Sequence, residues 1–126
     1  MVGHARAESP NECCGLLVGT AGTIGEAVAT TNTERGPTRY RVDPAEHFAL
    51  VRRLRGTAAD IVGAYHSHPR SPAVPSPSDV AEAISPLFLY VIVSLQAAEP
   101  DVRAYRIDGT EVREVALSPM PSRIPG

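Results

Sequence analysis

Hydrophobic residues in this chain gather in short runs of strand length, and helical segments are predicted between those runs. The run from Cys13 to Val18 is apolar on both alternating faces, which predicts a central strand covered on both sides, with Glu12 at its mouth. The run from Leu87 to Leu95 is nearly continuous and rich in β-branched and aromatic residues, so we predict that it forms the buried centre of a sheet. Ile61 to His68 is predicted as a further strand.

The other predicted strands are more polar. Thr23 to Thr31 follows a turn at Gly19 to Gly22 and is predicted as a strand of moderate polarity. Val102 to Ile107 and Glu111 to Leu117 are predicted to pair as a hairpin, because Asp108-Gly109 between them is a strong turn signal.

Three helices are predicted from their start and stop signals. Val2 to Glu8 forms the first, with Pro10 beyond its end. Asp43-Pro44 supplies the N-cap and first residue of the second, which ends at Gly56. The third runs from Pro77 to Ile84. For the second helix the predicted inward stripe consists of Phe48, Val51, Leu54 and Leu50, and His47 is placed on the solvent side.

This order of elements predicts an α/β fold with mixed strand pairing. A chain of 126 residues suits one domain, residues 1–126, whose end from Ser118 to Gly126 contains three prolines and is expected to be a loose tail. An apolar content of 43% with 21% charged residues is ordinary for a globular protein. No run has the length of a transmembrane helix, and the first ten residues lack the apolar segment of a signal peptide, so the cytoplasm is the expected location.

Charge and cysteine content narrow the classes of function. The formal net charge of −2 leaves no basic surface for nucleic acid or for an anionic membrane. Cys13 and Cys14 are adjacent, which is incompatible with ordinary disulfide geometry, and both fall in an apolar run. They are therefore expected to be buried, reduced and inert.

The chemistry is concentrated between Tyr65 and Asp79, in the segment Y-H-S-H-P-R-S-P-A-V-P-S-P-S-D. His66 and His68 alternate on a predicted strand, so both imidazoles leave the same face. Ser76, Pro77 and Asp79 have the order of an N-cap, a first helical residue and a carboxylate at the third position, which places Asp79 in the first turn of a helix. Two imidazoles and this carboxylate could hold a zinc ion and leave its fourth position for water.

This spacing resembles the signature of the JAMM (MPN+) metalloproteases. The signature is H-x-H, seven residues, S, two residues and D, and it is present here as His66, His68, Ser76 and Asp79. Glu12 in N-E-C-C-G-L-L-V-G matches the upstream catalytic glutamate of that family. With T-N-T-E-R-G-P-T-R-Y-R and Y-R-I-D-G, the resemblance covers nearly the whole chain. It is closest to the short bacterial and archaeal members that act on ubiquitin-like sulfur-carrier proteins.

The resemblance implies both a fold and a function. The fold is a curved mixed β-sheet flanked by helices, of the MPN/JAB and cytidine-deaminase-like type, in which a strand usually precedes the first helix. The implied activity is zinc-dependent hydrolysis of a peptide or isopeptide bond after the C-terminal Gly-Gly of a ubiquitin-like or sulfur-carrier protein, or of its cysteine adduct. Zn²⁺ is held by His66, His68 and Asp79, while Glu12 is the general base and Ser76 stabilises the oxyanion.

The segment between the second strand and the second helix carries three arginines. Arg35, Arg39 and Arg41 in this segment are candidates for binding a substrate carboxylate or chain end, because a guanidinium binds carboxylates bidentately. A solvated face is the alternative for all three. The expected partner is a small carrier protein, with no nucleic acid and no membrane, and a homodimer is left open.

Three alternatives remain. A non-catalytic MPN-type scaffold or binding module has the same fold, but such members typically lack the ligand set that is intact here. A RadC-type protein shares H-x-H-P and P-S-x-x-D, yet usually carries an additional upstream helical region. A zinc deaminase needs cysteine ligands in P-C-x-x-C, and Cys13-Cys14 lacks that spacing.

Overall fold

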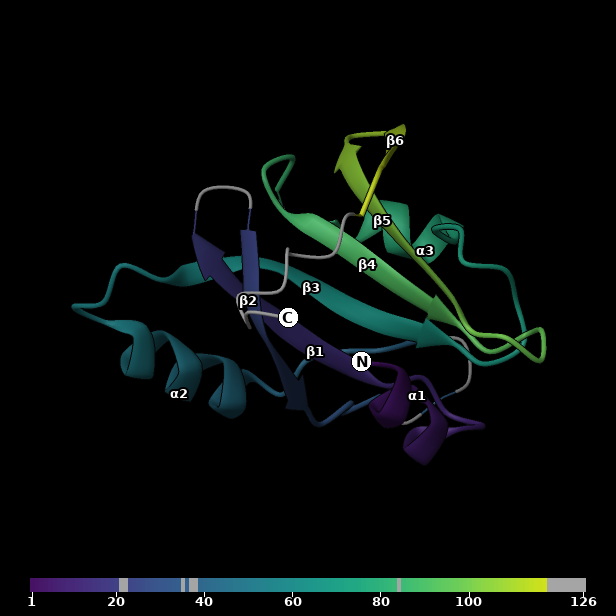
Figure 1. Cartoon of the computed structure of the whole chain (residues 1–126), viewed down its shortest axis with the longest axis horizontal. Coiled ribbons are helices and arrows are strands. Elements are labelled where there is room, and N and C mark those ends of the chain that lie inside the picture. Colours follow the sequence, from purple (N-terminus) through teal and green to yellow (C-terminus); the bar gives the residue numbers. More distant parts are fainter. Residues whose placement is uncertain (21–22, 35, 37–38, 84, 118–126) are drawn as a thin grey trace, which may run out of the picture.

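In the part of the chain that the structure describes, six strands form a single sheet, and three helices cover parts of its two faces (Figure 1). The computed structural model describes residues 1–20, 23–34, 36, 39–83 and 85–117. Within these ranges no helix is both long enough and apolar enough to cross a membrane. The elements are α1 (Val2–Glu8), β1 (Cys14–Thr20), β2 (Thr23–Thr30), α2 (Pro44–Leu54), β3 (Asp60–His68), α3 (Pro77–Ala81), β4 (Leu89–Ser94), β5 (Asp101–Asp108) and β6 (Glu111–Val115).

The strand order is β2-β1-β3-β4-β5-β6, and the pairing is mixed, as the order of elements predicts. Strands β3 and β4 are parallel, and every other neighbouring pair is antiparallel. The parallel pair needs a crossover, which is supplied by the segment containing α3. The two central strands β3 and β4 are buried over most of their length, which agrees with the prediction for the apolar run that forms β4.

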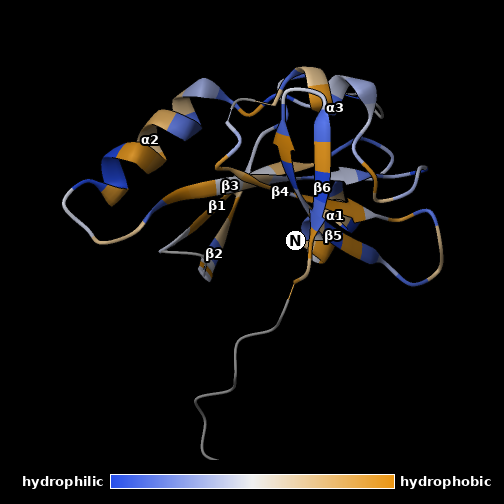
Figure 2. Ribbon diagram, turned by 90° about the horizontal axis from the view of Figure 1, so that it is seen from above, coloured by the Kyte–Doolittle hydropathy of each residue, from blue (hydrophilic) through white to orange (hydrophobic). Residues whose placement is uncertain are grey.

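The two faces of the sheet have different covers. Helix α1 packs on one face, where Ala5 joins a buried cluster with Leu17 and Tyr65. Helix α2 packs on the opposite face through Leu50, and α3 lies on that same side of the sheet (Figure 2). Helices α2 and α3 cover different strands, because the α2 cluster uses β1 and β3 and the α3 cluster uses β4 and β5.

The predicted inward stripe of α2 is wrong in part. Phe48 is 61% exposed and Val51 is 40% exposed, whereas Leu50 is 5% exposed. The reason is a polar contact: Glu46 accepts hydrogen bonds from the backbone N–H and the hydroxyl of Thr31, both at 2.6 Å. This contact turns the row Glu46, Leu50 and Leu54, spaced four residues apart, toward the sheet. His47 is exposed, as predicted.

The segment after the metal-ligand motif also differs from prediction. Helix α3 ends at Ala81 and not at Ile84, which itself lies outside the described residues. Pro86 follows shortly afterwards, and a proline disfavours helical conformation in the residue before it. Leu87, predicted inside the strand, is 82% exposed, and β4 begins at Leu89.

The remaining boundaries lie close to their predicted positions. A few residues predicted within strands lie just outside the observed ones. They are Cys13, Thr31, Leu95 and the last two residues of the predicted Glu111–Leu117 strand. Both cysteines are buried free thiols. Part of the Gly19–Gly22 turn and the tail from Ser118 onward lie outside the described residues.

Gly63 provides a test of the parallel pairing at the centre of the sheet. A Cβ atom at this position would lie 2.0 Å from the backbone oxygen of Leu89 on β4. Because backbone cannot easily move aside, Gly63→Ala should lower the free energy of unfolding by about 2 kcal/mol or more, measured by urea denaturation. Gly3→Ala in α1 is the matched control, since nothing lies within 4 Å of its added Cβ. Equal stability of the two variants would contradict the pairing.

Candidate metal centre

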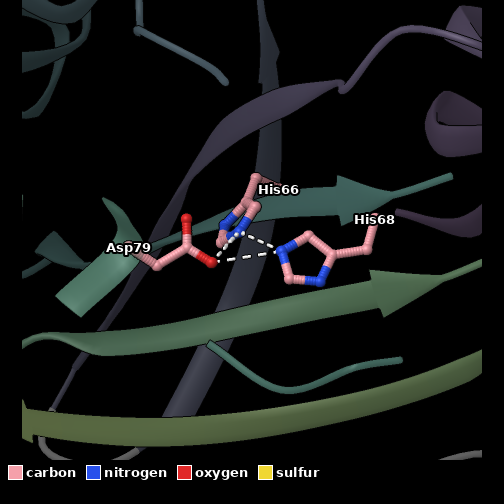
Figure 3. A group of neighbouring side chains, drawn as sticks. All are labelled: His66, His68 and Asp79. Atoms are coloured by element: carbon pink, nitrogen blue, oxygen red, sulfur yellow. Dashed lines mark hydrogen bonds and ion pairs between the residues drawn. The ribbon is translucent and has the colours of Figure 1, made fainter. Parts of the chain in front are cut away.

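His66 and His68 end strand β3, and both are almost fully buried. Their alternation on the strand directs both rings to the sheet face that α2 and α3 cover, as predicted. The two Nε2 atoms lie 3.1 Å apart (Figure 3). Sequence periodicity therefore suffices to bring these two imidazoles together.

Asp79 reaches the histidines from the first turn of α3. Its Oδ2 atom lies 3.1 Å from Nε2 of His66 and 3.1 Å from Nε2 of His68 (Figure 3). The carboxylate is held by a capping box: the backbone N–H of Ser76 donates to Oδ2 at 2.8 Å, and the Asp79 N–H donates to Ser76 Oγ at 3.1 Å. The predicted cap thus orients the carboxylate. The hydroxyl of Ser76 accepts one bond and keeps its own proton for donation.

These three side chains have the geometry of an open metal site. Ligands bonded at about 2.0–2.1 Å to a tetrahedral zinc ion lie about 3.3 Å from one another, and the three pairs of donor atoms here are each 3.1 Å apart. His68 Nδ1 donates to the carbonyl of Pro72 at 2.8 Å, which leaves the Nε2 lone pair facing the group. Lone pairs that converge in this way need a cation or a proton between them, so the residues fit a metal ion.

The pKa shifts of the three side chains are consistent with a site that binds a cation. Burial opposes ionisation of Asp79, but the interactions with the neighbouring His66 and His68 rings and with the Ser76 N–H outweigh burial and hold the pKa of Asp79 far below its ordinary value. Burial lowers the pKa of His66. Burial also acts to lower the pKa of His68, yet its bonds to Asp79 and to the Pro72 carbonyl raise that pKa overall. The carboxylate therefore stays charged and attracts a positive charge into the group.

Glu12 lies beside the group and is buried, with 4% of its surface exposed. In the described part of the chain, its Oε1 is the one buried side-chain nitrogen or oxygen atom that lacks a hydrogen-bond partner. Burial raises the pKa of Glu12 from 4.5 to about 8, the charge of His68 opposes this rise, and the charges of Asp79 and Glu82 add to it. A buried carboxylate with an unsatisfied oxygen and a raised pKa is suited to exchanging a proton with a water molecule.

The position of Glu12 is fixed through its neighbours. The N–H of Cys13 donates to Ser67 Oγ at 2.8 Å, and the Ser67 N–H donates back to the Cys13 carbonyl at 3.1 Å. Ser67 lies between the two histidines, so this exchange aligns Glu12 with them. The Glu12 N–H also donates to the Gly36 carbonyl at 2.8 Å.

Asn32 is a residue of the site that sequence reasoning missed. Its Nδ2 donates to the carbonyls of Glu12 and Arg39, and its Oδ1 accepts the N–H groups of Glu34 and Arg41, all at 2.9–3.0 Å. One side chain thus uses its full hydrogen-bonding capacity to join Glu12 to the segment that carries the arginines. An asparagine between threonines reads as a turn residue in sequence, which gives no signal of this role.

Tyr40 is a second residue that sequence reasoning missed. Its ring stacks on His66, with ring centroids 4.3 Å apart and planes inclined by 16°. The stack covers one side of a candidate ligand and limits the orientations of its ring. Tyr40 follows a stretch rich in Arg and Thr, and only the fold brings it to the histidines.

The predicted substrate-binding arginines are only partly described. Arg35 lies outside the described residues, and Arg39 and Arg41 are exposed. Arg41 lies 3.7 Å from Glu34 and lines a cavity of about 380 Å³ together with Tyr40. The floor of this cavity is apolar, with Leu16, Ala64 and Tyr90 among its lining residues. A larger cavity of about 550 Å³ reaches Glu12 from the side of α1 and the end of β2.

A family model and two relatives of known name match most of this chain. Residues 1–108 match the family described as prokaryotic homologs of the JAB domain. The chain is 39% identical over 118 residues to the CysO-cysteine peptidase of Mycobacterium tuberculosis, covering 90% of this chain and 81% of the relative. It is 35% identical over 127 residues to the desampylase of Haloferax volcanii, covering 94% and 88%.

A solved structure agrees with the sequence relatives. The solution structure of a protein from Desulfitobacterium hafniense superposes with a TM-score of 0.81 and 32% identity, covering 91% of this chain and 82% of that one. The family match extends over most of the chain and includes Glu12, His66, His68, Ser76 and Asp79. Together these findings confirm the resemblance drawn from the motif, and the chain belongs to the prokaryotic JAB domain family.

Proposed function

We propose that this protein is a zinc-dependent hydrolase that cleaves a peptide or isopeptide bond after the C-terminal Gly-Gly of a small ubiquitin-like or sulfur-carrier protein. The observation that carries the proposal is the convergence of His66, His68 and Asp79 beside the unpartnered carboxylate oxygen of Glu12. The names of the relatives support the substrate class, since one is a CysO-cysteine peptidase and another a desampylase.

In this proposal His66, His68 and Asp79 hold Zn²⁺ through the atoms that face one another. A zinc ion at such a site supplies Lewis acidity, which lowers the pKa of a water molecule to about 7 and polarises a peptide carbonyl. The protein's own contribution is orientation. The Pro72 carbonyl sets the tautomer of His68, Tyr40 limits the ring of His66, and the Ser76 N–H fixes the Asp79 carboxylate.

Two further side chains take part in the reaction: one transfers the proton of the attacking water, and the other stabilises the negative charge that develops on the substrate oxygen. Glu12 takes a proton from the attacking water on its free Oε1 and delivers it to the amine that leaves. The hydroxyl of Ser76, held beside Asp79, donates a hydrogen bond to the oxyanion of the tetrahedral intermediate. Burial raises the pKa of Glu12, which favours the protonated form that this carboxyl group reaches after it takes up the proton.

The surroundings of the site favour an extended substrate tail. Four prolines between Pro69 and Pro77 stiffen the loop beside the histidines, which narrows the space available to side chains near the scissile bond. The edge strand β2, separated from β3 by β1 alone, could pair with the tail by strand addition. Arg39 and Arg41 are exposed on the segment next to the cavity and could bind a carboxylate of the carrier protein.

Metal binding should depend on the histidine pair. We expect about one zinc ion per chain in the unchanged protein after metal loading, and much less in His68→Ala, because the variant removes one of three ligands. Metal analysis by mass spectrometry measures both. His47→Ala is the matched control, since this exposed imidazole on α2 is not one of the three grouped side chains. Equal zinc in all three proteins would exclude the proposed ligand set.

Catalysis should depend on Glu12 without any change in metal content. Glu12→Gln keeps the shape of the side chain but cannot accept the proton, so the rate should fall by about 10²–10⁴-fold at unchanged zinc stoichiometry. The assay is release of cysteine from a carrier-protein–cysteine adduct, followed by intact mass. Glu99→Gln, which changes an exposed carboxylate in the loop between β4 and β5, is the control. Full activity of Glu12→Gln would show that another group moves the proton, and inactivity of the unchanged zinc-loaded protein would favour a binding module.

The value of kcat/KM should fall steeply as the side chain of the residue before the last glycine of the substrate becomes larger. A carrier protein that ends in Gly-Gly should be cleaved efficiently, an Ala-Gly version more slowly and a Val-Gly version least, because the stiff loop excludes bulk. Comparison of kcat/KM for the three substrates measures this. If all three were cleaved equally, the cleft would not be narrow and the protein would be a broader peptidase.

A further inference from the structure

The loop between β3 and α3 is held in place by side chains and not by secondary structure. Four consecutive backbone carbonyls, from Arg70 to Ala73, each accept a hydrogen bond from a different side chain. Prolines at positions 69, 72 and 75 remove N–H groups that a strand or helix would use, so the loop depends on these donors. The donors are Gln96 Nε2 to Arg70 (3.4 Å), Ser94 Oγ to Ser71 (2.6 Å), His68 Nδ1 to Pro72 (2.8 Å) and the Tyr105 hydroxyl to Ala73 (2.5 Å).

One of these four bonds involves a candidate metal ligand. The Pro72 carbonyl can only accept, so its bond with His68 requires the proton on Nδ1 and leaves Nε2 unprotonated in the neutral ring. This tautomer is the one that presents a lone pair to Asp79 and His66. The position of the Pro72 carbonyl therefore decides whether His68 is ready to bind a cation.

The carbonyls on both sides of Pro72 are anchored from neighbouring strands. Ser94 at the end of β4 holds the Ser71 carbonyl, and Tyr105 on β5 holds the Ala73 carbonyl. Tyr105 is 4% exposed and Ala73 is 1% exposed, and both belong to the buried cluster beneath α3. Water cannot easily replace the buried Tyr105 bond, and the part-buried Ser94 bond holds the loop on the other side of Pro72, whose carbonyl also accepts the Val74 N–H at 2.8 Å.

The same loop leads directly into the capping box of α3. Its last residue, Ser76, donates its backbone N–H to Asp79 Oδ2, which is the oxygen that faces both imidazoles. A displaced loop would thus disturb two of the three candidate ligands at once: the tautomer of His68 and the orientation of Asp79.

We propose that Tyr105 and Ser94 are positioning residues for the metal centre. Neither residue contacts the candidate ligand atoms; each acts through the loop carbonyl that it binds. The inference rests on the metal role given to His66, His68 and Asp79 under the proposed function, and it assigns a part in that site to strands that the ligand motif does not include.

The test compares two tyrosines of the same sheet. Tyr105→Phe and Ser94→Ala should each weaken zinc binding by about 10-fold, measured by competition with a chromophoric chelator, and the double variant should weaken it further. Tyr65→Phe is the matched control: it also removes the hydroxyl of a buried tyrosine, but that hydroxyl bonds His4 Nδ1 at 2.8 Å, on the side of α1. Zinc affinity of Tyr65→Phe should equal that of the unchanged protein.

A second measurement needs no metal. Ring ¹⁵N chemical shifts of His68 in the metal-free protein, at a pH where the ring is neutral, should report the Nδ1–H tautomer alone, and Tyr105→Phe should show a mixture of tautomers. Unchanged affinity and an unchanged tautomer in Tyr105→Phe and Ser94→Ala would overturn the inference, as would an equal loss of affinity in Tyr65→Phe. If the unchanged protein binds no zinc at all, the proposed metal site fails together with the inference, even where the tautomer shift is seen.

Discussion

The register in which β1 pairs with β3 is the constraint on which the site depends. Cys14 lies opposite His66 in this antiparallel pair, and Cys13 and Ser67 exchange hydrogen bonds one position further along. Glu12 is therefore brought to the end of β3 where His68 lies. A slip of one residue would turn Glu12 to the opposite face from the imidazoles, because side chains alternate along a strand. The buried Ser67 hydroxyl prevents such a slip by satisfying the Cys13 N–H.

Burial gives the two carboxylates of the site opposite properties. Asp79 accepts the Ser76 N–H and lies against two imidazoles, and it stays ionised despite partial burial. Glu12 has an oxygen without a donor, and desolvation raises its pKa to about 8. Under the proposed function, these two groups of the same chemistry serve different tasks: Asp79 attracts and orients a cation, and Glu12 takes up a proton.

Local patterns in the sequence were sufficient for much of the fold and for the candidate ligands. The spacing of His66 and His68 on a strand, and the order Ser76-Pro77 before Asp79, depend only on backbone periodicity and capping chemistry, which act over a few residues. The same kind of pattern gave a partly wrong inward face for α2, since Leu50 and Leu54 pack on the sheet but Phe48 and Val51 are exposed. The helix carries two overlapping apolar rows, and a distant contact between Glu46 and Thr31 selects the row containing Leu50.

By itself the sequence indicated the candidate ligands and the cap, because their identity and short spacing are local properties of the chain. The base role proposed for Glu12 came from the family resemblance, since Glu12 lies far from the histidines along the chain. The tertiary structure decided which distant groups support them. Asn32 joins Glu12 to the arginine segment, Tyr40 stacks on His66, and Tyr105 holds a loop carbonyl 32 residues before it. These partners have no spacing rule, since they meet only when strands far apart in sequence are paired and packed. Long-range register, and not residue type, is therefore what completes the site.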